Sequence, residues 1–279
     1  MIEPLLTTIT PVWGRDQMFQ KWCRHMRAAQ HPQVRHLVVL VNEKIPSWWW
    51  ELGLPSNFVL REVWSNVSNV SIGAHHNFGA EESRSEWIMK LDVDTIPHVN
   101  FWQALLPVLE KAAPRQWFNV GMGYMTQRVS ESVVSGFTSS HLTGEVVVRM
   151  LQSPRDYFAN WRGSPAGTNF VARREDYLLQ AACDPRFRGY GWEDYQQIYD
   201  LERFEIGGDP FCGTSVTYQN VTRLCRDVIG MRKAAELLSK NGCLCLLHHW
   251  HPVGSGLYRN RGQMDRNRAV LLEHCSRKG

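Results

Sequence analysis

The chain of 279 residues is long enough for one large domain with a sizeable buried core, and its composition, 43% hydrophobic and 21% charged, is that of a globular protein. No stretch reaches the roughly 18 uncharged apolar residues of a transmembrane helix. The net charge of +4 is uneven, because residues 223–279 hold 11 Lys and Arg against 4 Asp and Glu. That excess suits an anionic partner such as a diphosphate, an acidic glycan, a membrane surface or nucleic acid, although solubility alone would also explain it.

The N-terminal stretch "MIEPLLTTITPVWGR" predicts a first strand and not a signal peptide. It has no basic segment before its apolar residues, and it carries Glu3 and Pro4 among them. Seven cysteines are scattered without a C-x-x-C pair, and Cys243 and Cys245 lie on one apolar run as buried thiols. We therefore expect a cytoplasmic protein with reduced thiols.

Strand-like and helix-like stretches alternate through the first half. Strands are expected at 5–12, 34–42, 57–63 and 87–94, and helices at 16–30, 47–55, 78–86 and 101–113, with a polar loop and a short strand at 66–77. This order predicts an α/β fold with a Rossmann-like, doubly wound mixed sheet flanked by helices. Ligands of such sheets bind at the carboxyl ends of the strands.

The second half is less regular. Strands are expected at 118–125, 143–150 and 243–249, a loop, strand and helix over 164–182, and helices from about 193 to 204 and over 221–242, the latter closed by Gly242. Without repeats or a linker, the chain reads as a single domain over 1–279. Within it, 1–113 is expected to bind a nucleotide, 114–252 to hold the acceptor and catalytic groups, and 253–279 to form a basic tail.

Residues 90–95 read "KLDVDT" and place two carboxylates one residue apart after an apolar run. On a strand, Asp92 and Asp94 would point the same way and repel each other unless a cation offsets their charge. Carboxylate oxygens suit Mg²⁺ or Mn²⁺ bound with a phosphate-bearing ligand. The alternative is a polar strand end facing water.

Residues 188–196 read "RGYGWEDYQ". The two glycines allow a close approach of the backbone to a ligand, and Trp192 offers a flat face to a sugar ring. Glu193 and Asp194 would fall in the first turn of a helix, where one of them is placed to take a proton from an attacking hydroxyl. Acidic residues in a first helical turn are also favoured by the helix dipole alone.

Residues 246–252 read "LLHHWHP" and place three histidines after an apolar strand. If the strand continues, His249 and His251 share a face and His248 lies opposite. Imidazole is a common ligand of transition metals, including Mn²⁺. A structural role for the histidines is the alternative.

Together these features resemble the GT-A glycosyltransferases, the enzymes that use nucleotide-sugars, in a family-two-like layout. The resemblance covers about residues 5–252 and follows the chain order "TTITPVWGR", "HNFGAEESRSEWIMKLDVD", "GTNFVARREDYLLQAACDPRFRGYGWED" and a His before Pro252. The second strand ends in "VNEK" where many relatives carry an Asp for the nucleobase.

The resemblance implies roles for individual residues. Asp94 would bind the metal, Asp92 the ribose or the metal and its water, and His249 would be the third protein ligand with His251 in reserve. Asp194 would be the catalytic base and Glu193 would hold acceptor or sugar hydroxyls. The donor pocket would be lined by Thr10, Pro11, Arg15, Asn77 and Lys90, and the acceptor side by Trp192, Tyr190 and Gly191.

The function that this resemblance implies is transfer of a sugar, of the hexosyl type, from a nucleotide-diphosphate sugar to an acceptor hydroxyl, with Mn²⁺ or Mg²⁺. Either inversion or retention is compatible with these residues, and in-line attack would invert. The default acceptor is a glycan or lipid-linked saccharide. An alternative is a hydroxymethylated base in DNA, suggested by the basic residues Arg259, Arg261, Arg266, Arg268, Arg277 and Lys278. A nucleotidyltransferase would need a glycine-rich N-terminal loop. The alternative outside the enzymes is a non-catalytic nucleotide-sugar-binding protein.

Overall fold

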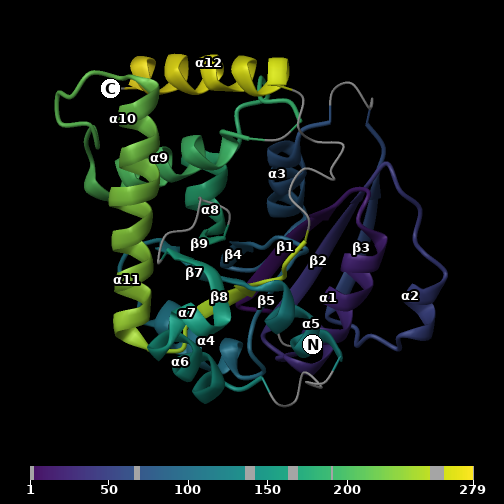
Figure 1. Ribbon diagram of the computed structural model, residues 1–279. Helices are drawn as coiled ribbons and strands as arrows, with labels where there is room; N and C mark the ends of the chain where they lie inside the picture. The colour runs from purple at the N-terminus through teal and green to yellow at the C-terminus, as the bar shows by residue number, and fades with distance from the viewer. Residues whose placement is uncertain are drawn as a thin grey trace.

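The computed structural model describes residues 3–65, 70–135, 142–162, 169–189, 191–251 and 261–278. Its larger sheet has six strands in the order β3 (Phe58–Val63), β2 (Val34–Val41), β1 (Leu6–Val12), β4 (Trp87–Lys90), β9 (Phe170–Arg173) and β6 (Phe118–Asn119). The first four strands are parallel, and β9 runs antiparallel to both β4 and β6. The predicted mixed, doubly wound sheet is confirmed (Figure 1).

A second sheet has four strands in the order β5 (Thr95–Ile96), β10 (Cys245–His248), β7 (Gly121–Met125) and β8 (Phe158–Arg162). β10 runs parallel to β7 and antiparallel to β5, with His248 opposite Thr95. This pairing brings the end of β10 beside the turn that joins β4 to β5.

Helices cover both sheets (Figure 1). The first half holds α1 (Asp16–Ala28), α2 (Trp48–Glu51), α3 (Ile72–Glu82) and α4 (Phe101–Glu110). The second half holds α5 (Gln127–Ser135), α6 (Gly144–Gln152), α7 (Pro154–Tyr157), α8 (Arg174–Asp176), the π-helical η3 (Tyr177–Ala181), α9 (Glu193–Ile206), α10 (Tyr218–Thr222), the π-helical η4 (Arg223–Gly230), α11 (Met231–Lys240) and α12 (Arg261–Lys278).

Two cores lie on opposite faces of the six-stranded sheet, because successive strand residues alternate between faces. Val38 and Leu40 of β2 pack with Phe19 and Trp22 of α1. Leu37, Val39 and Val41 of the same strand belong to the other core, with residues of α3, α9 and α12. The continuous apolar run at 34–42 is therefore a strand buried on both sides, as predicted.

Several predicted boundaries are wrong. The strand expected at 87–94 ends at Lys90, and the two aspartates lie in the following turn and not on a strand.

The strand expected at 143–150 is helix α6. The Thr143 side chain caps its start by accepting a hydrogen bond from the Val146 amide, and the helix buries Val147 and Met150, three residues apart on one face. Of the loop and short strand expected at 66–77, residues 72–77 form the start of α3, capped by Ser71, and residues 66–69 lie outside the described residues. Where one helix was expected over 221–242, α11 ends at Lys240 with Asn241 extended, so Gly242 does not cap it.

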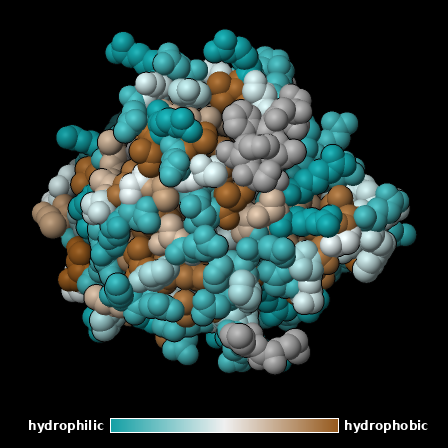
Figure 2. Space-filling model, turned by 90° about the horizontal axis from the view of Figure 1, so that it is seen from below, coloured by the Kyte–Doolittle hydropathy of each residue, from teal (hydrophilic) through white to brown (hydrophobic). Residues whose placement is uncertain are grey.

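The surface seen from below mixes hydrophilic and hydrophobic side chains (Figure 2). Among the helices of the described ranges, none combines the length and the apolar character needed to cross a bilayer.

Candidate metal and catalytic site

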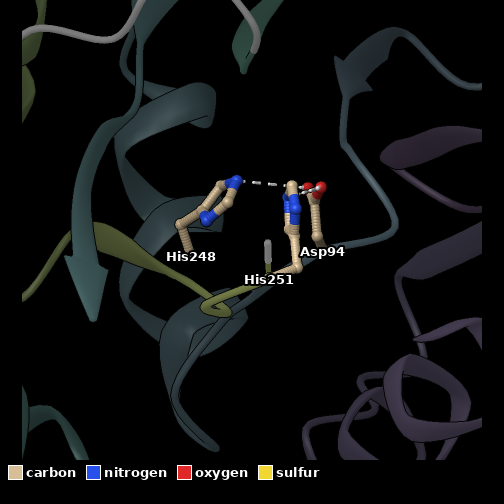
Figure 3. A group of neighbouring side chains, drawn as sticks. All are labelled: Asp94, His248 and His251. Carbon is tan, nitrogen blue, oxygen red and sulfur yellow. Dashed lines mark ion pairs between the residues drawn. The ribbon is translucent and has the colours of Figure 1, made fainter. Parts of the chain in front are cut away.

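Asp94, His248 and His251 point toward one another at the edge of the second sheet (Figure 3). The Nε2 atom of His251 lies 3.2 Å from Asp94 Oδ2, and the Nε2 atom of His248 lies 3.6 Å from Asp94 Oδ1. One ligand atom from each residue fits within 4.8 Å of the others. The local backbone fixes this arrangement, because the His249 amide donates to the Asp94 carbonyl at 2.8 Å.

The chemistry of these three residues fits a divalent transition metal. Two imidazole nitrogens and a carboxylate suit Mn²⁺ better than Mg²⁺, which prefers an all-oxygen shell. Asp94 is 6% exposed, and within the part of the chain that the structure describes its Oδ1 has no hydrogen-bond partner. Burial alone would raise the pKa of Asp94, but the hydrogen bond from His251 and the charges of His248 and Arg15 lower it below its usual range.

His249 lies away from this group, which corrects the predicted alternation. β10 ends at His248, so the alternation of faces stops there, and His248 and His251 come to the same side. His249 is buried, its Nδ1 lies 3.1 Å from the Ser130 hydroxyl, and its ring centroid lies 5.5 Å from that of His25. Burial and the neighbouring His25 lower the pKa of His249 to about 3.

Asp92 is half-buried in the turn after β4. Its amide donates to the Asn169 side chain at 3.2 Å, and its carbonyl accepts from the Thr95 hydroxyl at 2.8 Å. Burial and the negative charge of Asp94 raise the pKa of the Asp92 carboxyl to about 8. The two aspartates thus repel each other, as predicted, although a turn and not a strand brings them together.

A second polar cluster is centred on Lys90 at the end of β4. Its Nζ forms a buried ion pair with Asp194 Oδ1 and lies 3.3 Å from Gln197 Oε1. Burial favours the neutral amine, but the charges of Asp194, Glu193 and Asp92 outweigh it, so the pKa of Lys90 is raised. The ammonium therefore holds together carboxylates that would otherwise repel one another.

Glu193 and Asp194 lie in the first turn of α9, where the sequence placed them. Glu193 is 3% exposed, and its Oε2 has no hydrogen-bond partner among the described residues. Burial and the charge of Asp194 raise the pKa of Glu193 to about 7. A buried carboxyl with an unpaired oxygen is available to bond a hydroxyl of a ligand.

The residues before α9 adopt an unusual backbone. Gly189, Gly191 and Trp192 all have positive φ, at 63°, 104° and 75°. A tryptophan in the left-handed region costs of order 1 kcal/mol or more, so its surroundings must hold it there. The Trp192 Nε1 donates to the Met264 carbonyl at 3.1 Å, and its ring packs 5.3 Å from Tyr195 and 5.1 Å from Tyr218, measured between centroids. Tyr190 lies outside the described residues.

The expected donor residues divide into two groups. Arg15 pairs with Asp94 Oδ2. Thr10 is buried in β1 beside the half-buried Pro11, and its hydroxyl has no hydrogen-bond partner in the described ranges. Asn77 instead joins α3 to η3: its amide bonds the Cys183 backbone at 2.8 and 3.0 Å and accepts from the Tyr177 hydroxyl at 2.7 Å.

Three residues near the site were missed from the sequence. The sequence pattern placed His248 on the wrong face. No motif pointed to Gln197, although it follows Glu193 by four residues and helical spacing puts Glu193 and Gln197 on one face. His76 is 2% exposed, and burial and the charge of Lys90 hold its pKa well below 6.5. Nothing in "HHN" distinguishes this histidine from its neighbour.

The basic tail is partly used within the fold. α12 packs on α9 and α10 (Figure 1). Lys278 pairs with Asp200 at 2.9 Å, Arg277 pairs with Glu273, and Arg268 lies over the Tyr218 ring at 4.0 Å from its centroid.

No protein-family model matches the chain, and no curated protein sequence matches it. Among solved structures, it is similar to glucosyl-3-phosphoglycerate synthase from Mycobacterium tuberculosis in complex with Mn²⁺, UDP-glucose and phosphoglyceric acid. That match has a TM-score of 0.51 and 15% identity and covers 98% of this chain and 80% of the synthase. TarS 1–349 of S. aureus matches 73% of this chain with a TM-score of 0.48 and 8% identity, and the match spans only 55% of that structure. The fold is of the GT-A glycosyltransferase type.

Proposed function

We propose that the protein is a metal-dependent glycosyltransferase that moves a sugar from a nucleotide-diphosphate sugar to an acceptor hydroxyl. The observation that carries the proposal is the meeting of two clusters at the carboxyl end of β4. Asp94 with His248 and His251 form the first cluster, and Glu193 with Asp194 form the second. Asp92 interacts with both through its charge, with Asp94 on one side and Asp194 on the other, and Lys90 pairs with the second cluster.

Asp94, His248 and His251 would hold the cation, with Arg15 beside the carboxylate. When bound, Mn²⁺ would supply positive charge to offset the charge that grows on the departing diphosphate. Arg15 lies at the start of α1, so its guanidinium reaches the same space from another element and is placed to bond a phosphate oxygen.

Asp194 is proposed as the general base. Its Oδ1 is paired with Lys90, which orients the carboxylate. The second carboxylate oxygen is left to accept the proton of the acceptor hydroxyl, while the hydroxyl oxygen attacks the anomeric carbon and the diphosphate departs. Glu193, with its unpaired Oε2, is proposed to bond a hydroxyl of the sugar or the acceptor. The exclusion of water from these carboxyl groups strengthens both interactions.

The test begins with donor binding. Thermal unfolding is followed with UDP-glucose, the donor held by the synthase neighbour, and with other nucleotide-diphosphate sugars, in Mn²⁺, Mg²⁺ or EDTA. We expect stabilisation by a donor only when metal is present, and more with Mn²⁺ than with Mg²⁺. No stabilisation by any donor in any metal would overturn the proposal.

The acceptor is then sought with the donor so identified. Saccharides and lipid-linked glycans form one set, and duplexes containing hydroxymethylated bases form the other. Transfer to either set should be lost in Asp194→Asn, while donor binding in that variant persists. Transfer that survives in Asp194→Asn would exclude this residue as the base.

A further inference from the structure

Asn267 of α12 holds the backbone that leads into the catalytic helix. It is 2% exposed, and its side chain makes three hydrogen bonds to this segment. The Oδ1 accepts from the Arg188 amide at 3.1 Å, and the Nδ2 donates to the carbonyls of Arg188 at 2.6 Å and Gly191 at 3.1 Å. All three partners are backbone groups, so their identity does not depend on the side chains of the segment.

We propose that Asn267 is a positioning residue for Asp194, and that α12 sets the orientation of the first turn of α9. The inference rests on the proposed function, because it assumes that Asp194 acts on the acceptor. Asn267 lies 73 positions beyond Asp194 in the chain and touches neither a metal ligand nor a base in the described structure. Its influence on the reaction is exerted through the backbone of Arg188 and Gly191.

The opposite side of the same segment is fixed by α3. The Gly189 amide donates to the Val70 carbonyl at 2.5 Å, and the Ile72 amide donates to the Gly189 carbonyl at 3.5 Å. Gly189 thereby forms a parallel bridge with Ser71, the N-cap of α3. The segment is consequently held between the start of one helix and the face of another. On the α3 side the hydrogen bonds are made by backbone groups, and on the α12 side they are made by the Asn267 side chain.

The backbone of this segment needs such support. Gly189, Gly191 and Trp192 have positive φ, and for Trp192 this is a conformation that L residues rarely adopt. Strained conformations persist only where their surroundings over-determine them. Gln263 of α12 packs so closely on Gly189 that an added Cβ would come within 2.8 Å of its amide, and Met264 accepts from the Trp192 ring.

α12 is itself anchored farther along α9. His274 Nε2 lies 2.8 Å from Asp200 Oδ2, and Lys278 Nζ lies 2.9 Å from Asp200 Oδ1. Asp200 is 3% exposed and follows Asp194 by six residues on the same helix. α12 therefore contacts α9 both before its first turn and near its middle, which fixes its direction as well as its start.

Loss of the Asn267 contacts should act on turnover and not on donor binding. The proposed metal ligands and Arg15 lie on β10, on the β4–β5 turn and at the start of α1, which Asn267 does not contact in the described structure. A misplaced base lowers the rate without altering the affinity for the donor.

The experiment compares Asn267→Asp and Asn267→Ala with Asn57→Ala. Aspartate keeps the shape and the acceptor for the Arg188 amide but cannot donate to the two carbonyls. Asn57 is a matched control, since its Nδ2 also donates to two backbone carbonyls, those of Val34 at 2.8 Å and His31 at 3.5 Å, at the start of β2. UDP release from UDP-glucose with Mn²⁺ is measured below the unfolding transition of each variant, with hydrogen exchange of residues 188–199.

For both Asn267 variants we expect kcat to fall about ten- to a hundredfold with the KM for UDP-glucose unchanged. The amides at the start of α9 should exchange at least about tenfold faster. Asn57→Ala should lower the melting temperature and change neither quantity. Equal exchange in Asn267→Ala and wild type, or a fall in kcat no larger than in Asn57→Ala, would overturn the inference. If the wild type released no UDP and no donor stabilised it in any metal, the proposed function would fail on its own, and the exchange result would still decide whether Asn267 holds α9.

Discussion

Lys90 and Asp194 are 104 residues apart in the chain and form a buried ion pair at the point where β4 meets α9. The lysine side chain is 4% exposed and that of the aspartate 11%. Glu193 and Asp92 add two further negative groups around the same ammonium. The pair therefore joins the strand that leads to the proposed metal ligands to the helix that carries the proposed base.

Lys90→Met should destabilise the protein by about 3–5 kcal/mol, because it leaves buried carboxylates without their cation. Urea unfolding at neutral pH measures this change. In a double-mutant cycle, the variant that combines Lys90→Met with Asp194→Asn should lose less unfolding free energy than the two single variants lose in sum. The reason is that Asp194→Asn removes a charge that Lys90→Met leaves unpaired. Additive losses would show that the two side chains do not interact in the folded protein.

Lys233→Met provides the control for function. Lys233 is fully buried, and its Nζ lies 2.6 Å from Glu205 Oε1 and 3.5 Å from Glu236 Oε2, away from the site. It should lose comparable stability and keep its turnover of donor below its melting temperature. Lys90→Met, in contrast, should lose turnover at every temperature, because the proposed base loses the group that orients it.

His248→Ala and His251→Ala should each abolish the stabilisation by Mn²⁺, whereas His249→Ala should keep it. The first two residues face Asp94, and the third bonds Ser130. Titration of each variant with Mn²⁺, followed by thermal unfolding, separates the two outcomes. Mn²⁺ binding that fails only in His249→Ala would restore the assignment made from strand alternation.

The sequence predicted the sheet well because its strong signals are local. The apolar run at 34–42 and the helical spacing of Phe19, Trp22 and Met26 depend only on neighbours in the chain, and both elements lie where they were expected. The predicted strand extended beyond the end of β4 because Leu91 and Val93 continue its apolar pattern. In the structure both residues are buried, but they lie in the turn that follows the strand. Periodicity does not show where a strand stops pairing.

The site was predicted by residue type more reliably than by geometry. Glu193 and Asp194 begin a helix, as the motif indicated, whereas Asp94 is faced by His251, which the sequence placed second to His249. The place of His248 depended on where β10 ends, which is set by its pairing with the two-residue strand β5. The ring of Trp192 packs against Tyr218 and α12 because of contacts with residues far along the chain, which no local pattern contains.

Gly79→Ala should destabilise the protein by about 1–3 kcal/mol, although alanine favours a helix. Gly79 lies in α3 where the helix crosses β1, and an added Cβ would overlap the Cγ2 of Ile9. Equilibrium unfolding measures the cost. Combined with Ile9→Ala, which opens the space, the glycine change should become neutral or stabilising, and a cost that persists in that background would contradict the packing explanation.

Lowering the pH should destabilise the protein through buried neutral histidines. Burial lowers the pKa of His36 from its ordinary 6.5 to about 3. Below about pH 6.5 this histidine therefore binds a proton in the unfolded chain, whereas in the folded protein it stays neutral down to about pH 3. The free energy of unfolding consequently falls as the pH falls through this window. The slope that this one residue contributes approaches about 1.4 kcal/mol per pH unit.

The variant Thr8→Val/His36→Phe should flatten that dependence. His36 Nδ1 lies 2.9 Å from the Thr8 hydroxyl, so replacing both residues removes the hydrogen bond without leaving an unpaired group, and the new ring takes the place beside Phe58, whose centroid lies 4.6 Å from that of His36. Urea unfolding between about pH 4 and 6 should give a slope lower by about 1.4 kcal/mol per unit. The contribution of His25, whose pKa burial lowers to about 4, should remain in both proteins. Parallel stability curves for the variant and the wild type would show that His36 takes up its proton in the folded state as readily as in the unfolded chain.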